Sequence, residues 1–176
     1  NYSQGCVDKV VCSDDTITIF LLDGTTLTWG KNQFGQLGNN TTTLQSSPIT
    51  TINESDWSDI NHARMHTVAI HQNGTLWTWG NNAVGQLGNG TTTDSYVPVQ
   101  VGTDSDWSVI SPGNLHTVAL KSNGTLWGWG NNGAYELNNG GSNVVTNPVQ
   151  LSPDTDWNKI YGGYFKTFAI KNNGTL

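Results

Sequence analysis

Short apolar segments alternate with polar stretches along this chain, and the whole arrangement recurs about every fifty residues. Between positions 57 and 101 the apolar segments cover 57–60, 65–71, 75–79 and 96–101. The residues between them are rich in Gly, Asn and Thr. Segments of this length with many β-branched and aromatic residues are typical of β-strands. The pattern therefore predicts four strands in each unit.

The repetition is internal and in register. Gly24, Gly74, Gly124 and Gly174 share one spacing, and the segment HTVAIHQNGTLWTWGNN at 66–82 recurs as HTVALKSNGTLWGWGNN at 116–132. We expect repeats at 7–56, 57–106 and 107–156, and an incomplete one at 157–176. Together they predict a single partial domain over 1–176.

Turn residues fix how the strands of each unit connect. Asn73-Gly74 lies between two apolar segments, and Asn-Gly is the preferred pair for a two-residue type I′ hairpin turn. We therefore expect a type I′ turn there and at the equivalent positions of the other repeats. Pro98 lacks a backbone donor, which predicts that the fourth strand lies at a sheet edge.

The second strand of each unit is apolar on both faces. Val68 and Ile70 point to one side of the strand and Ala69 to the other. One small sheet cannot bury both of its own faces, but a stack of neighbouring sheets can. Four strands per unit, stacked in this way, predict β-propeller blades.

At these motifs the chain resembles the RCC1 (regulator of chromosome condensation) repeat family. The resemblance rests on H-T-V-A-L, on N-G-T-L-W-x-W-G, and on G-Q-L-G at 35–38 and 85–88. It implies an all-β fold of four-stranded antiparallel blades, with about 3.5 blades of a seven-bladed propeller present. We expect the chain to be part of a longer polypeptide. The third copy departs from the motif, because Tyr135-Glu136-Leu137-Asn138 replaces Gly-Gln-Leu-Gly.

Charge and composition exclude several function classes. The chain has 7 Lys+Arg against 13 Asp+Glu and a net charge of −6, which disfavours nucleic acid and anionic membranes as partners. No apolar run approaches the roughly 18 residues of a membrane span. Cys6 and Cys12 could form a disulfide or remain free buried thiols. Their spacing does not predict a zinc site.

No motif indicates catalysis or a cofactor, so we expect neither. His66 and His116 occupy a repeat position that also holds Thr16 and Lys166, which favours a structural role at a strand edge. His62 and His71 occur once each and are interpreted as surface residues.

Paired carboxylates precede the first strand of each unit. Asp104 and Asp106, and likewise Asp154 and Asp156, are weak candidates for calcium, which prefers oxygen ligands. Two carboxylates supply fewer oxygens than calcium needs. The favoured interpretation is therefore that these side chains cap a turn, and no metal is predicted.

Candidate binding residues are aromatic or lie in variable loops. Trp77 and Trp127 replace Leu27 and, if exposed, would be good anchors for a partner. The loops 39–47, 89–96 and 139–147 differ most between repeats, and they include Asp94 and Tyr96. Tyr135 is a candidate because it breaks the motif of its loop.

Together these features predict a non-enzymatic binding or structural scaffold. Its expected partner is a protein, a glycan or neighbouring subunits of an assembly. The expected location is extracellular, on a cell surface or on a phage virion. Two alternatives come from the resemblance: a guanine-nucleotide exchange regulator, and an inhibitor of a secreted enzyme. Fold alone does not choose between them.

Overall fold

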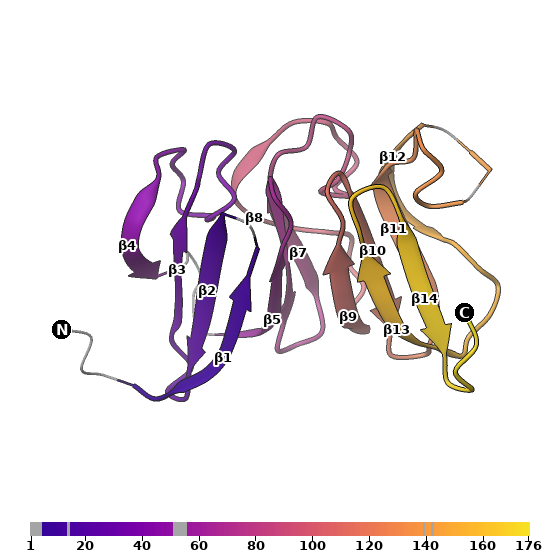
Figure 1. Ribbon diagram of the computed structural model, residues 1–176, viewed down its shortest axis with the longest axis horizontal. Coiled ribbons are helices and arrows are strands. Elements are labelled where there is room, and N and C mark those ends of the chain that lie inside the picture. The colour runs from indigo at the N-terminus through magenta and orange to yellow at the C-terminus, as the bar shows by residue number, and fades with distance from the viewer. Residues whose placement is uncertain (1–4, 14, 51–55, 139, 142) are drawn as a thin grey trace.

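The chain folds into a row of antiparallel β-sheets set side by side (Figure 1). The computed structural model describes residues 5–13, 15–50, 56–138, 140–141 and 143–176, and its regular elements there are all strands. Three sheets have four strands in chain order and the last has two. We call these sheets blades 1 to 4. The all-β prediction with four-stranded antiparallel blades is confirmed.

Each blade uses the same strand lengths and order. Blade 1 contains β1 (Val7–Cys12), β2 (Thr16–Leu21), β3 (Thr26–Gly30) and β4 (Gln45–Thr50). Blade 2 contains β5 (Trp57–His62), β6 (His66–His71), β7 (Leu76–Gly80) and β8 (Ser95–Gln100). Blade 3 contains β9 (Trp107–Pro112), β10 (His116–Lys121), β11 (Leu126–Asn131) and β12 (Val144–Gln150). Blade 4 contains β13 (Trp157–Gly162) and β14 (Thr167–Lys171).

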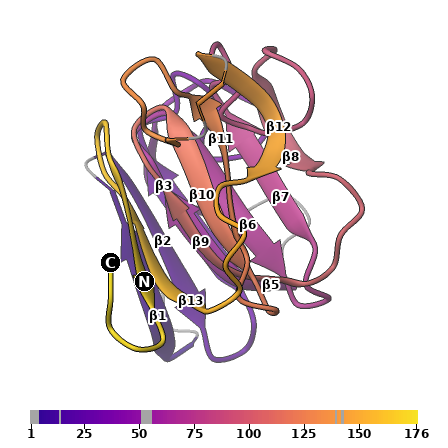
Figure 2. The same cartoon turned by 90° about the vertical axis from the view of Figure 1, so that its right-hand side faces the viewer.

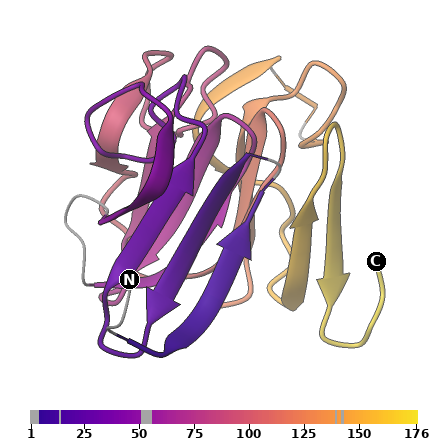
Figure 3. The same cartoon turned by 60° about the vertical axis from the view of Figure 1, so that its left-hand side comes forward.

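The strands of a blade run from an inner to an outer position. The first strands β5, β9 and β13 contact one another in sequence, and β1 contacts β5, so these strands form the inner side of the row. In blade 2 the outermost strand β8 pairs only with β7, which confirms the edge position predicted from Pro98. Figure 2 shows the row from the end that carries the β13–β14 hairpin, and Figure 3 brings the blade 1 end forward.

The hairpin turns differ from the expected type. Gly74 N donates to His71 O at 2.8 Å and His71 N donates to Thr75 O at 2.9 Å, so the loop has three residues. Gly74 has φ +81° while Asn73 stays at negative φ, which excludes type I′. Asn73 Oδ1 instead accepts hydrogen bonds from the backbone and hydroxyl of Thr75. The prediction was wrong because an Asx turn gives Asn a role that needs no left-handed backbone.

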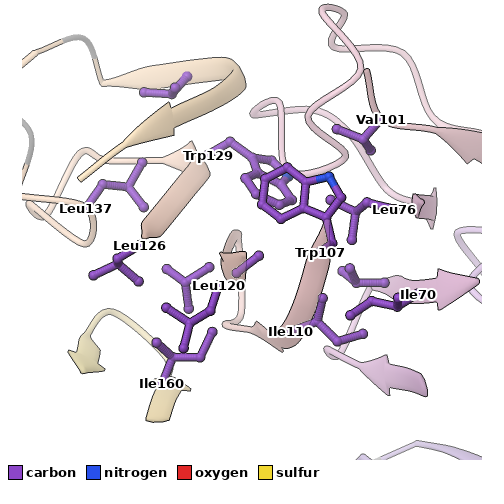
Figure 4. Packing of buried hydrophobic residues seen from close by; sticks show 14 residues of the cluster. Ile70, Leu76, Val101, Trp107, Ile110, Leu120, Leu126, Trp129, Leu137 and Ile160 are labelled. Atoms are coloured by element: carbon purple, nitrogen blue, oxygen red, sulfur yellow. The ribbon is translucent and has the colours of Figure 1, made fainter. Parts of the chain in front are cut away.

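The hydrophobic core lies between the blades, as the two-faced pattern of β6 predicted. A cluster that spans blades 2, 3 and 4 includes Val68, Ala119, Trp129 and Ile160 (Figure 4). A second cluster joins blades 1 and 2 around Trp57 and Trp79. Each blade therefore depends on its neighbours to bury its apolar faces.

Backbone carbonyls of one blade also bind side chains of the next blade. Gln36 O accepts hydrogen bonds from Thr67 Oγ1 at 2.7 Å and Trp79 Nε1 at 2.8 Å. In the next pair of blades, Gln86 O accepts from Thr117 Oγ1 and Trp129 Nε1. These bonds satisfy polar groups inside the apolar interface and fix the register between blades.

Candidate binding surfaces

Each blade presents two chemically different ends. His66 pairs with Gly80, so the long loop after β7 lies where β6 begins, and the hairpin turn at 72–75 lies at the opposite end. We call the first the loop end, with loops 31–44, 81–94 and the described part of 132–143. We call the second the turn end, with turns 22–25, 72–75, 122–125 and 172–175.

At the turn end the paired carboxylates bind lysine. Lys121 Nζ lies 2.6 Å from Asp104 and 3.1 Å from Asp106, and Lys171 repeats this with Asp154 and Asp156. Partial burial lowers the pKa of Lys121, but hydrogen bonds to both carboxylates outweigh it and the pKa is raised. Hydrogen bonds to Asp154 and Asp156 likewise raise the pKa of Lys171. The carboxylates that the sequence offered for calcium thus already hold an ammonium group.

The tryptophans that replace Leu27 in blades 2 and 3 make contacts within their own blades. Trp77 and Trp127 are half-buried, and each indole N–H donates to the preceding Thr75 or Thr125 hydroxyl at 2.9 Å. Trp127 packs edge-on against Trp107, and Lys121 Nζ lies 5.0 Å from both rings. Cation–π and edge contacts therefore use part of each ring within the blade, and the role of these two residues as anchors for a partner stays a prediction.

The loop end is built on buried asparagines. Asn82 is fully buried; its amide donates to Thr91 O at 3.0 Å and Thr93 O at 3.1 Å, and its carbonyl accepts from Leu87 N. Asn32 makes matching bonds to Thr41 and Leu37 in blade 1. These bonds hold the exposed Thr-rich segments in place. The loops are therefore preformed surfaces.

The predicted loop residues have different environments. Asp94 is half-buried and accepts from Asn82 N at 2.7 Å, so it anchors its loop. Tyr96 is 42% exposed beside Gly35 of blade 1, and Asn40 N donates to its carbonyl. Tyr135 is 76% exposed and has φ +61°, a backbone conformation that is strained for a bulky residue. Both tyrosines are at the loop end; the position of Tyr135 matches Gly35 and Gly85, which lie against the fourth strand of the next blade.

The histidines lie between blades. His66 is fully buried with Nε2 2.9 Å from Thr117 Oγ1 of blade 3. Since Thr117 gives its own proton to Gln86 O, His66 donates through Nε2. His62 contacts Thr18 and Thr67, so it is not the expected surface residue. Burial lowers the pKa of His66 to about 3 and of His62 to about 4.

An open space of about 640 Å³ lies beside the β13–β14 hairpin, where blades 2 and 3 have their third strands with Trp79 and Trp129. Tyr135, Glu136, Trp157, Phe165 and Phe168 are among the residues that line it. Phe165 is 50% and Phe168 45% exposed. The sequence differs from the earlier blades here, with KTFAI at 166–170 in place of HTVAI and HTVAL.

Two remaining features bear on expectations from the sequence. Cys6 and Cys12 are free and exposed, so neither the disulfide nor the buried thiols are found. Among the described residues, no helix is long and apolar enough to cross a membrane.

Stacked four-stranded blades joined through inter-blade carbonyls define the chain as part of a β-propeller. The regulator of chromosome condensation (RCC1) repeat matches residues 23–70 and 73–120, more than half of the chain, and a second description of this repeat matches 110–136. The chain belongs to the RCC1 repeat family. A comparison with curated proteins gives no match.

Solved structures confirm the architecture. The chain is similar to human WBSCR16, with a TM-score of 0.83, 19% identity, and coverage of 96% of this chain and 46% of that one. It is similar to yeast RCC1 (Prp20) in a structure with Kap60, with a TM-score of 0.82, 20% identity, and coverage of 98% and 43%. Another structure of Prp20p from Saccharomyces cerevisiae gives a TM-score of 0.79 at 19% identity, with coverage of 93% and 42%. The chain thus spans less than half of each relative, and these likenesses show the fold alone.

Proposed function

We propose that this chain is a non-enzymatic, protein-binding part of an RCC1-type propeller, and that it binds its partner at the loop end. The observation that carries the proposal is the pairing of anchored loops with exposed aromatic side chains. Asn82 and Asp94 fix the 81–94 loop from inside, while Tyr96 at the start of β8 and Tyr135 in the blade 3 loop are exposed. Preformed loops with tyrosine side chains bind protein surfaces at low entropic cost.

The turn end is a weaker candidate for recognition. Its lysines and carboxylates are paired within the blade, and its tryptophans are held by intrablade contacts. A partner would have to break these contacts before it gained its own. This difference between the two ends supports the loop end as the binding surface.

A protein array probed with the labelled chain tests the proposal. Matched variants are Tyr96→Ala/Tyr135→Gly at the loop end and Gln72→Ala/Ser122→Ala at exposed turn-end positions. We expect the loop-end pair to weaken binding about tenfold or more, as removal of central aromatic contacts does. The turn-end pair should leave it unchanged. Binding only to a glycan array, or equal losses for both pairs, would contradict the proposal.

Guanine-nucleotide exchange is a second candidate. The observation that favours it is the likeness to Prp20p, whose structure is described together with its binding to Gsp1p and histones. A nucleotide-release assay on a panel of small GTPases separates the two candidates. Accelerated release would favour exchange, whereas binding without release favours the scaffold.

We also propose an extracellular, cell-surface or virion location. The polar, cation-poor composition, with 7 Lys+Arg in 176 residues, supports it. Labelling of intact source cells or particles with a membrane-impermeant biotin reagent tests it. Labelling only after lysis would contradict it.

A further inference from the structure

The turn between the first two strands of each blade carries a different side chain at its centre. That position is Arg64 in blade 2, Asn114 in blade 3 and Tyr164 in blade 4, and the sequence of blade 1 has Asp14 there. In blades 2 to 4 a threonine nevertheless follows three positions later in every case. Positions that vary on a repeated scaffold are where recognition concentrates. These turns are therefore a candidate recognition surface of their own.

The same turns lie at the loop end, on the inner side of the row. His66 follows the blade 2 turn and pairs with Gly80, where the long loop begins. A pocket of about 320 Å³ opens among the turns, and its lining residues come from all four blades and include Ser13, His62, Arg64, Asn114, Gly163 and Tyr164. The third and fourth strands of a blade lie on its outer side, and none of the lining residues belongs to one. The inner turns and the ends of the first strands alone thus form the pocket.

The pocket is cationic although the chain as a whole is acidic. Arg64 is the only arginine in the chain, is exposed, and makes no ion pair with any described residue. Four lysines, in contrast, each contact an aspartate: Lys9, Lys31, Lys121 and Lys171. No Asp or Glu is among the described residues that line the pocket. Burial lowers the pKa of His62 to about 4, so this neighbour is neutral and the charge of Arg64 is uncompensated.

Further hydrogen-bond donors in the pocket are unused. Ser13 Oγ is buried and has no hydrogen-bond partner. The backbone N–H of Asn114 donates to Gly163 O at 3.1 Å, but its side-chain amide makes no hydrogen bond within the described part of the chain. The turn that carries Arg64 is fixed, because Gln36 Nε2 of blade 1 donates to Arg64 O at 3.3 Å. The pocket therefore offers preformed, unpaired donors to an anion.

We propose that this pocket binds the carboxylate of an aspartate or glutamate side chain of the partner protein. The planar guanidinium of Arg64 can form two parallel hydrogen bonds with the two oxygens of a carboxylate. The Ser13 hydroxyl and the Asn114 amide can donate to lone pairs that remain on the same oxygens. A phosphate group carries about two charges and fits less well, because Arg64 is the only cationic group among the described lining residues. The inference rests on the proposed protein-binding function and names the chemistry of one contact at the loop end.

Titration with Nα-acetyl-glutamate methylamide tests the proposal directly, and the matched glutamine compound is the neutral control ligand. Amide NMR shifts of the whole chain report binding. Because a charge-assisted hydrogen bond is stronger than a neutral one, the glutamate compound should bind at least about fivefold more tightly than the glutamine compound. The shifts should centre on residues 62–64 and 112–114.

Three variants separate the ion pair from general charge effects. Arg64→Gln keeps an amide donor but removes the charge, and it should abolish the preference for glutamate over glutamine. Lys166→Gln is the matched control, because Lys166 is also exposed at the loop end and does not line this pocket, so the preference should be unchanged. Ser13→Ala should weaken glutamate binding about twofold or more through the loss of one donor. Chemical unfolding of each variant verifies that it remains folded.

Equal binding of the two compounds, or a preference for glutamate that persists in Arg64→Gln, would overturn this inference. Its failure and that of the proposed function are distinguishable. If an array partner binds wild type and Arg64→Gln equally, the protein-binding function stands and only the carboxylate contact is wrong. If no protein binds but the glutamate compound binds through Arg64, the pocket stands and the broader function is wrong.

Discussion

At the scale of single residues, the structure separates side chains that hold the blades from those left for a partner. Asn82 and His66 are fully buried and make polar bonds that neighbouring loops or blades require. Tyr135 differs from both, because it adopts φ +61° and most of its side chain is exposed. A strained backbone at an exposed aromatic residue is typical of sites kept for function.

Replacement of Tyr135 with glycine should therefore stabilise the chain. Tyr135→Gly removes the left-handed strain and loses little buried surface, so we expect the free energy of unfolding to rise by about 1 kcal/mol. Asn138→Gly is the matched control and should gain less, because asparagine tolerates the left-handed region. Urea unfolding measures both. A less stable Tyr135→Gly variant would show that the tyrosine is structural.

At the scale of elements, the unit of stability is the contact between blades. The Gly88 loop lies directly against Trp129 of the following blade, while the same indole N–H donates to Gln86 O at 3.0 Å. Glycine is needed here for two separate reasons, a positive φ and the absence of a Cβ. Gly102, in contrast, meets only the first condition.

Gly88→Ala should consequently destabilise the chain more than the same substitution at a glycine that has a positive φ but no close neighbour. We expect a loss of about 2 kcal/mol or more, since the new methyl group displaces the indole and breaks its hydrogen bond. Gly102 has φ +62° with no atom near an added Cβ, so Gly102→Ala should cost about 1 kcal/mol from backbone strain alone. Equal losses in thermal or urea unfolding would refute the role of the inter-blade contact.

Much of the arrangement of strands and blades was predictable from the sequence. The fifty-residue period, the two-faced β6 pattern and Pro98 predicted the strands, their stacking and the outer edge. The turn type was not predictable, because Asn-Gly suits both a type I′ turn and the observed three-residue loop. The environment of Trp127 depended on Lys121 and Thr125, and that of Trp77 on Thr75 and Trp57, which pattern alone does not place beside them.

At the scale of the whole molecule, neutral histidines lie in successive junctions of the row. His62 joins blades 1 and 2, His66 joins blades 2 and 3, and His116 lies 3.0 Å from Thr167 of blade 4. Burial lowers the pKa of all three, while Glu136 partly opposes this at His116. Protonation is therefore unfavourable in the folded row and favourable once the blades separate.

The row should be acid-labile. When the pKa of a histidine is lower in the folded chain than in the unfolded chain, the free energy of unfolding is highest above the unfolded-state pKa, near 6.5. It decreases as the pH falls from there toward the folded-state pKa. His66, with its pKa near 3, should alone remove about 2 kcal/mol between pH 7 and pH 5. Urea unfolding at several pH values measures this loss. His66→Gln keeps a donor toward Thr117 and should flatten the dependence, whereas an unchanged slope would exclude His66 as a cause.

The central claim is that rigid blades present the loop end to a protein partner. Hydrogen–deuterium exchange of the chain, with and without a partner found on the array, tests it most directly. The account predicts new protection at residues 89–96 and 132–138, and no change at the turns 72–75 and 122–125. Protection confined to those turns would contradict it and place recognition at the opposite end of the blades.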